Sequence, residues 1–191
     1  MRRSTRKLLW RGIIAASAGL ALLLSQTGTA AACPAAGYAQ RTVTTAGGST
    51  FHLSLIAGPT TQPASGGRSV VEGVGYNTEQ GIFLAFCAIP STVKVGDPTT
   101  YTALPTPCLP GHATKDGSSR RITNTATGTP GITLPYGPDG SFLTSLENLQ
   151  PQIADGVVCD VTVECAIVTR ADFTATSDRS YDQYIPVHFQ R

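Results

Sequence analysis

The three histidines are the first residues to consider for chemistry in this chain: His52, His112 and His188. A hydrolase would place one of them beside a nucleophile, but the sequence contains no G-x-S-x-G element that would present a serine at a strand-to-helix turn. His52 and His188 occupy alternating positions of expected strands, where solvent or hydrogen bonding accounts for them. His112 follows Gly111 in a long loop and is the candidate ligand for a metal or haem iron.

Acidic residues form two further groups. Asp155, Asp160 and Glu164 are close enough in sequence to resemble the carboxylate pair of a glycosidase, yet Asp160 and Glu164 are spaced like outward-facing strand residues. Three aspartates between residues 172 and 182 lack the one-residue spacing and the glycine of a calcium loop. The residues therefore predict a protein that is not an enzyme, and they indicate no metal site and no cofactor.

The cysteines divide into two local pairs, Cys87 with Cys108 and Cys159 with Cys165, and one single residue, Cys33. The short interval between Cys159 and Cys165 contains no glycine, proline or histidine, whereas zinc sites usually need a tighter knuckle or nearby histidines. In an exported chain, the oxidising environment favours the interpretation of paired cysteines as disulfides over their interpretation as metal ligands. Four cysteines allow three pairings, and we expect the sequence-local one.

Export is predicted by the first 32 residues. Met1 to Arg11 carries five basic residues and no acidic one, Gly12 to Leu24 is apolar apart from Ser17, and cleavage is expected near Ala32. We therefore assign residues 1–32 to a signal peptide that uses the general secretory or the twin-arginine route. Removing it leaves nine basic against twelve acidic residues, a net charge of −3, so nothing indicates a nucleic-acid partner.

Cys33 directly follows the expected cleavage site, which makes it a candidate for lipidation; the alternatives are a free, trimmed or intermolecularly bridged thiol. Membrane association is expected only if Cys33 is lipidated. The predicted location is therefore extracellular, either secreted or associated with the cell envelope.

The remaining chain predicts an antiparallel β-sandwich, because short apolar runs are separated by glycine, proline, serine and threonine. We divide it into a short extension, residues 33–49, and one domain, residues 50–191. Ile82 to Ile89 is almost wholly apolar and should form a central strand covered on both faces. Gly111 to Thr129 is polar and is expected to be an exposed loop, and Pro186 predicts an edge strand.

Three segments resemble secreted actinomycete proteins of the neocarzinostatin-like family. They are Val70 to Asn77 followed by Gly81 to Cys87; Pro138 to Phe142; and Asp155 to Thr169 with the closing Asp178 to Ser180 and Tyr184 to Phe189. The closing segment is closer to a surface-protein variant of this fold than to the chromophore carriers. The resemblance implies an immunoglobulin-like sandwich of about seven strands with two disulfides.

The resemblance also implies an apolar cleft beside the first disulfide, the bridge between Cys87 and Cys108. Its wall would include Phe86, Tyr101, Tyr136 and Phe142 as apolar or stacking surface. Packing in the core is the alternative role for the two phenylalanines, and anchoring of loops is the alternative for the two tyrosines.

The expected function is that of an exported, non-catalytic interaction module of the cell envelope or medium. The alternative is a small-molecule binder of the neocarzinostatin kind, and a further alternative is a haem-uptake accessory protein that uses His112. The interaction module comes first because the only tryptophan, Trp10, lies in the leader, which leaves few aromatic residues for a large ligand. The expected partner is thus an envelope protein or an apolar small molecule.

Overall fold

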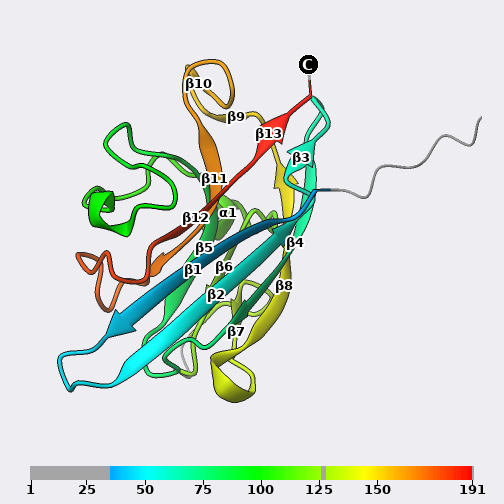
Figure 1. The fold of residues 1–191 in the computed structure, drawn as a ribbon. Helices are drawn as coiled ribbons and strands as arrows, with labels where there is room; N and C mark the ends of the chain where they lie inside the picture. The colour runs from blue at the N-terminus through cyan, green and yellow to red at the C-terminus, as the bar shows by residue number, and fades with distance from the viewer. Residues whose placement is uncertain (1–34, 126–127, 191) are drawn as a thin grey trace, which may run out of the picture. The chain divides into compact units, whose positions relative to one another are not determined.

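The computed structural model describes residues 35–125 and 128–190. The predicted signal peptide, residues 1–32, and Cys33 lie outside the described residues, so cleavage and lipidation stay predictions. The described part is mostly β structure, with sheets built largely from antiparallel strands (Figure 1). Among these residues no helix is both long and apolar enough to cross a membrane.

The first sheet has four strands in the order β1, β2, β4 and β8, all antiparallel to their neighbours. They are β1 (Gly37–Thr44), β2 (Thr50–Gly58), β4 (Gly67–Val74) and β8 (Phe142–Leu149). In β2 and β4 alternate residues are buried, so that every second side chain faces the core. The sheet therefore has one buried and one exposed face.

The second sheet has five strands in the order β12, β11, β5, β6 and β7. They are β12 (Gln183–Pro186), β11 (Cys165–Ala171), β5 (Ile82–Ala88), β6 (Ser119–Ile122) and β7 (Thr133–Leu134). All neighbours are antiparallel except β6 and β7. The edge position predicted for the strand that contains Pro186 is confirmed, because β12 ends the sheet.

Short elements complete the described chain. Strands β3 (Thr61–Gln62) and β13 (His188–Phe189) pair in parallel, and β9 (Gln152–Ala154) pairs with β10 (Val157–Val158). The helical turns are η1 (Pro98–Thr100), α1 (Gly111–Thr114) and η2 (Pro138–Gly140). Strand β13 is thus a separate element and does not continue β12.

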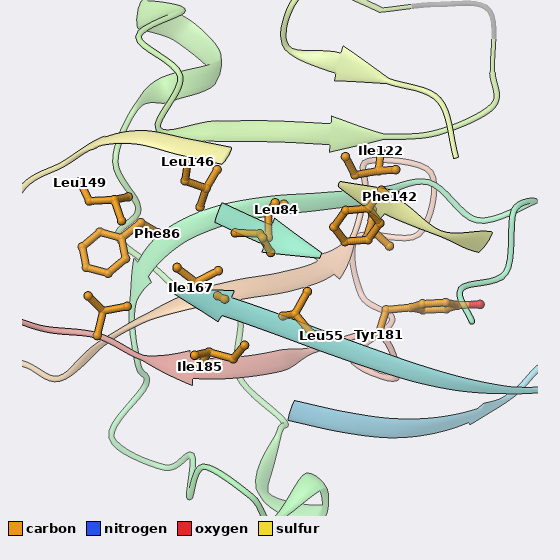
Figure 2. Packing of buried hydrophobic residues seen from close by; sticks show 14 of the residues in the cluster. Leu55, Leu84, Phe86, Ile122, Phe142, Leu146, Leu149, Ile167, Tyr181 and Ile185 are labelled. Atoms are coloured by element: carbon orange, nitrogen blue, oxygen red, sulfur yellow. The ribbon is translucent and has the colours of Figure 1, made fainter. Parts of the chain in front are cut away.

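One buried cluster joins side chains from both sheets. Figure 2 shows Leu55 of β2 and Leu146 of β8 near Leu84 of β5, Ile167 of β11 and Ile185 of β12. All five are buried, with exposures of 0% or 1%. Each fully buried aliphatic side chain contributes roughly 1.5–3 kcal/mol relative to an exposed one, so this cluster is the main source of stability.

The other face of β5 is also covered. Ala85 and Cys87 belong to a second buried cluster with Val93 and Tyr101, which come from the long segment after the strand. The ring of Tyr101 lies edge-on to that of Tyr184, at 4.8 Å between centroids. The prediction that this apolar strand is central and covered on both faces is therefore confirmed.

Two segments differ from what their composition suggested. Residues 37–44, in the predicted N-terminal extension, form β1 and pair with β2 along their whole length. The polar segment 111–129, expected to be an exposed loop, contains β6, where Ser119 and Arg121 are buried at 6% and 3% exposure. That strand was not recognised because its buried positions are polar and are stabilised by neighbours from distant parts of the chain.

Both predicted disulfides are present. Cys87 bonds to Cys108 across 21 residues, and Cys159 bonds to Cys165 across six. Disulfides of this kind are typical of proteins that mature in an oxidising compartment outside the cytoplasm.

Candidate functional site

A hollow of about 320 Å³ lies beside the Cys87–Cys108 disulfide. Its apolar surface comes from Phe83 and Ala85 of β5, from Cys108 of the disulfide, and from Leu109 and Pro110, which follow Cys108 in the chain. The remaining lining side chains are His112, Ala113, Ser119 and Arg170. The volume is at the low end for small-molecule sites, so the hollow suits a compact ligand.

Strand pairing explains why these residues meet. Across the second sheet, Phe83 is the register partner of Arg170 on β11, and Ala85 is the partner of Ser119 on β6. Because side chains alternate along a strand and register partners point to the same side, all four lie on the face of the second sheet that is opposite the main core. The segment after β5 covers this face farther along, near Tyr101, and leaves it open at Phe83.

Arg170 supplies positive charge to the hollow. Its guanidinium carbon is 4.9 Å from the centroid of the Phe83 ring, a cation–π contact. Burial lowers the pKa of Arg170, and the nearby Arg179 lowers it further, against the charges of Asp182 and Asp172. An arginine nonetheless stays protonated at any physiological pH.

The two carboxylates that act on Arg170 are paired with other arginines. Asp172 is 2.8 Å from Arg121, and Asp182 is 3.2 Å from Arg179. The lining of the hollow contains no Asp or Glu. Arg170 therefore forms no ion pair with a carboxylate within the described residues, although the charges of Asp182 and Asp172 act on it from a distance.

Two lining residues carry buried polar atoms without a hydrogen-bond partner in the described part of the chain, Nε of Arg170 and Oγ of Ser119. Leaving such an atom unsatisfied costs roughly 1–3 kcal/mol. Three larger hollows, of about 370, 390 and 510 Å³, have no atom of this kind in their linings. This hollow is therefore the strongest candidate site.

A structural ion pair supports one side of the site. Nε and a terminal nitrogen of Arg121 each lie 2.8 Å from the same oxygen of Asp172, and the Arg121 guanidinium lies 4.1 Å from the ring centroid of Phe173. Burial raises the pKa of Asp172, but hydrogen bonds from Thr174 and Arg121 outweigh it, so the net pKa is lowered. Arg121 is thus committed to the fold, although it belongs to the segment Gly111 to Thr129 that was expected to be an exposed loop.

The four aromatic residues expected in a cleft wall are all buried, and none lines this hollow. Phe86 packs against Phe189 in the main core, at 6.0 Å between ring centroids. Tyr136 and Phe142 are 6.5 Å apart and both contact Tyr76. Phe142 also lines a different hollow, on the side of the first sheet, of about 390 Å³.

The three histidines lie apart. His112 lines the hollow, where its ring meets Phe83 edge-on at 6.2 Å, whereas His52 bonds to Thr42 on the first sheet. Within residues 35–125 and 128–190 no group of three or more His, Cys, Asp or Glu side chains is arranged to hold a metal ion.

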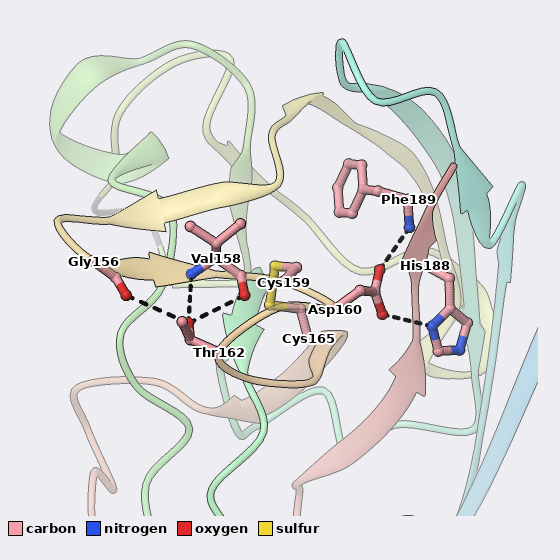
Figure 3. Close-up of a disulfide and its surroundings, with 8 residues drawn as sticks. All are labelled: Gly156, Val158, Cys159, Asp160, Thr162, Cys165, His188 and Phe189. Carbon is pink, nitrogen blue, oxygen red and sulfur yellow. Dashed lines mark hydrogen bonds and ion pairs between the residues drawn. A yellow bond between two sulfur atoms is a disulfide. The ribbon is translucent and has the colours of Figure 1, made fainter. Parts of the chain in front are cut away.

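The second disulfide organises a different region (Figure 3). One carboxylate oxygen of Asp160 lies 2.8 Å from Nδ1 of His188, and the other accepts a hydrogen bond from the backbone N–H of Phe189 at 2.7 Å. Thr162 Oγ1 accepts a hydrogen bond from the backbone N–H of Val158 at 2.8 Å. Asp160, considered above as part of a carboxylate pair, therefore holds the C-terminal strand β13.

Comparison with known proteins gives no further guide, because no protein-family model, curated protein or solved structure matches this chain.

Proposed function

We propose that this protein is an exported, non-catalytic binding protein that holds a small apolar molecule in the hollow beside Cys87 and Cys108. The observation that carries the proposal is the combination, in one place, of the Phe83 surface with unpartnered polar atoms of Ser119 and Arg170. A ligand with an apolar body and a polar end would cover the Phe83 surface and hydrogen-bond to the guanidinium of Arg170.

The proposal includes an immunoglobulin-like sandwich. Besides β1, the strands of four or more residues among the described residues are β2, β4, β5, β6, β8, β11 and β12. One sheet contains β2, β4 and β8. The other contains, in spatial order, β12, β11, β5 and β6. This division supports a Greek-key arrangement of two sheets around a shared core. The hollow lies beside the first disulfide, where the resemblance to the neocarzinostatin-like family implies a cleft.

Native mass spectrometry tests this function on the protein recovered from its own culture, with the medium and the envelope fraction measured separately. A non-covalent mass that is lost on denaturation would support a carried small molecule. Recovery of only the bare polypeptide, lighter by four hydrogens for its two disulfides, would contradict a tightly held ligand. A haem mass would instead favour the haem-handling alternative, which predicts a Soret band that His112→Ala abolishes.

A second candidate function, an interaction module for a protein of the cell envelope, is favoured by the exposed face of the first sheet. Five large hydrophobic side chains there are between 41% and 72% exposed: Tyr38, Ile56, Val70, Val74 and Leu143. Strand register aligns Tyr38 with Ile56 across β1 and β2, and Leu143 lies on the same row across β4. Exposed apolar surface of this kind is typical of a protein-binding face.

A further inference from the structure

We infer that the ligand of this hollow is an apolar carboxylate: a planar or aliphatic body that lies on Phe83 and a carboxylate that pairs with Arg170. The inference rests on the proposed function and specifies the ligand's chemical class. It depends on the charge and geometry of residues that are close in space but far apart in sequence.

The charge balance favours an anion. Arg170 is half-buried, the two acidic residues whose charges act on it are paired with Arg121 and Arg179, and no acidic residue lines the hollow. A cation in such a place loses part of its hydration, and the nearby carboxylates offset this loss only in part because they are paired with other arginines. A carboxylate bound in the hollow would supply a direct counter-charge.

The geometry favours a carboxylate over a compact spherical ion. The guanidinium carbon of Arg170 lies 4.9 Å from the centroid of the Phe83 ring. Nε of Arg170 is buried, which leaves the edge formed by the two terminal nitrogens for a ligand. Two parallel N–H groups on that edge match the two oxygens of a carboxylate. The Ser119 hydroxyl, which has no partner among the described residues, is a further donor beside the same surface.

The apolar surface determines the rest of the ligand. Phe83 is half-buried, and Leu109, Pro110 and Ala85 continue the surface away from Arg170. His112 meets the Phe83 ring edge-on and adds a polarisable side to the hollow. A fused aromatic ring or a short branched chain would therefore bury its apolar area here while its carboxylate remains at Arg170.

Binding of two matched probes tests the inference. The probes are 1-naphthoate, which is ionised at pH 7.5, and its neutral methyl ester, with the full chain expressed behind its own leader so that export and disulfide formation occur. Probe fluorescence is a suitable signal because the only tryptophan, Trp10, is in that leader. We expect the acid to bind at least tenfold more tightly than the ester, and this preference to shrink as salt concentration rises.

Variants locate the effect. Arg170→Gln should bring the acid to within about twofold of the ester, and Ser119→Ala should weaken the acid several-fold with little effect on the ester. Arg68→Gln is the matched control, because the Arg68 side chain is 65% exposed and belongs to the other sheet. Thermal unfolding of each variant shows whether it is folded. The ratio of acid affinity to ester affinity in the wild-type protein tests the inference even if a variant does not fold.

Three results would overturn the inference. Equal binding of acid and ester to the wild-type protein would leave the small-molecule function standing and exclude the carboxylate. Persistence of the preference in Arg170→Gln would place the anion elsewhere. Failure of both probes to bind would exclude apolar carboxylates of this size, whereas the small-molecule function is judged independently by the mass of the protein recovered from culture.

Discussion

Arg170 lies opposite Phe83 in the ladder between β11 and β5, and its guanidinium carbon is 4.9 Å from the centre of the Phe83 ring. The contact joins an aromatic surface to a cation that has no carboxylate partner among the described residues. It turns one end of a β-sheet face into a surface with both apolar and anion-binding character.

Phe83→Ala should weaken both naphthoate and its methyl ester by a similar factor, because both lose the same stacking surface. The expected loss is about tenfold, and it should leave the ratio of acid to ester nearly unchanged if the hollow keeps its shape. Phe173→Ala is the control, since Phe173 is 58% exposed and contacts Phe83 without lining the hollow. An unchanged affinity for both probes in Phe83→Ala would contradict the proposed site.

Asp182 should make the protein less stable as pH rises between about 4 and 7. Burial raises the pKa of this carboxyl to about 7, against the nearby Arg179 and Arg41. The folded state then holds a proton that the unfolded state releases near pH 4, so rising pH favours unfolding throughout that interval. The slope from this one group is at most about 1.4 kcal/mol per pH unit.

Urea unfolding of the wild-type protein and of Asp182→Asn, measured from pH 4.5 to 7.5, checks this contribution. The difference between the two free energies of unfolding should change with pH, and the variant should have the flatter dependence. Asp155→Asn, at an exposed position, should follow the wild-type curve. Parallel curves for wild type and Asp182→Asn would exclude the effect.

Asp160→Ala should loosen the C-terminal strand, because it removes the acceptor for the Phe189 N–H and the partner of His188. The expected loss is roughly 1–3 kcal/mol in the free energy of unfolding. Asp160→Asn should lose less, since an asparagine keeps one side-chain acceptor and tolerates the positive φ of 59° at this position.

Hydrogen exchange of the Phe189 amide, measured beside urea unfolding, locates this effect. Faster exchange at Phe189 in Asp160→Ala is expected, and Asp155→Ala should leave it unchanged. Unaltered protection of Phe189 in Asp160→Ala would show that the hydrogen bond does not hold the strand.

Removing the first disulfide with Cys87→Ser and Cys108→Ser together should lower the free energy of unfolding by about 3 kcal/mol, the chain-entropy value for a loop of this length. Naphthoate binding should weaken as well, because Cys108 lines the hollow and the disulfide holds the segment that carries Leu109 and Pro110. Unchanged binding in a folded double variant would show that the hollow does not depend on the bridge.

Leu143→Ser addresses the second candidate function. Leu143 is 72% exposed, so the substitution should change stability by less than about 0.5 kcal/mol. If an envelope protein binds the exposed face of the first sheet, the variant should be released from the envelope fraction into the medium. Leu104→Ser, at a 46% exposed position in the segment after β5, is the control that should stay with the wild-type protein.

Apolar patterning was enough to predict the central strand, because burial on both faces requires an almost wholly apolar run. Cysteine spacing was enough to predict the two disulfides. The hollow was not predicted from spacing, since Phe83, Ser119 and Arg170 meet through strand register, which sequence does not display. The available signal was the alternation Ala166, Val168, Arg170 on β11, which places a cation at the end of an apolar row.

Strand β6 and strand β1 were missed for different physical reasons. The buried residues of β6 include Ser119 and Arg121, and the buried charge of Arg121 is tolerated because it bonds to Asp172, 51 positions away. Along β1 only Val43 is fully buried. Because the other positions do not need a buried apolar side chain, the sequence of β1 shows no strong apolar alternation. Its place is set by pairing with β2 and by contacts such as that between Gln183 Nε2 and the Ala39 carbonyl oxygen, 3.1 Å apart.

The position of β1 at the end of the first sheet has a practical consequence for trimming the protein. A chain that begins at Thr50 would keep every residue of the hollow but would leave one side of the β2 backbone without its hydrogen-bonding partner over the eight residue pairs that β1 now makes. An exposed strand edge of that length recruits strands from other molecules. Such a shortened protein is therefore prone to aggregate or to exchange strands, and residues 37–44 belong in any soluble form of the domain.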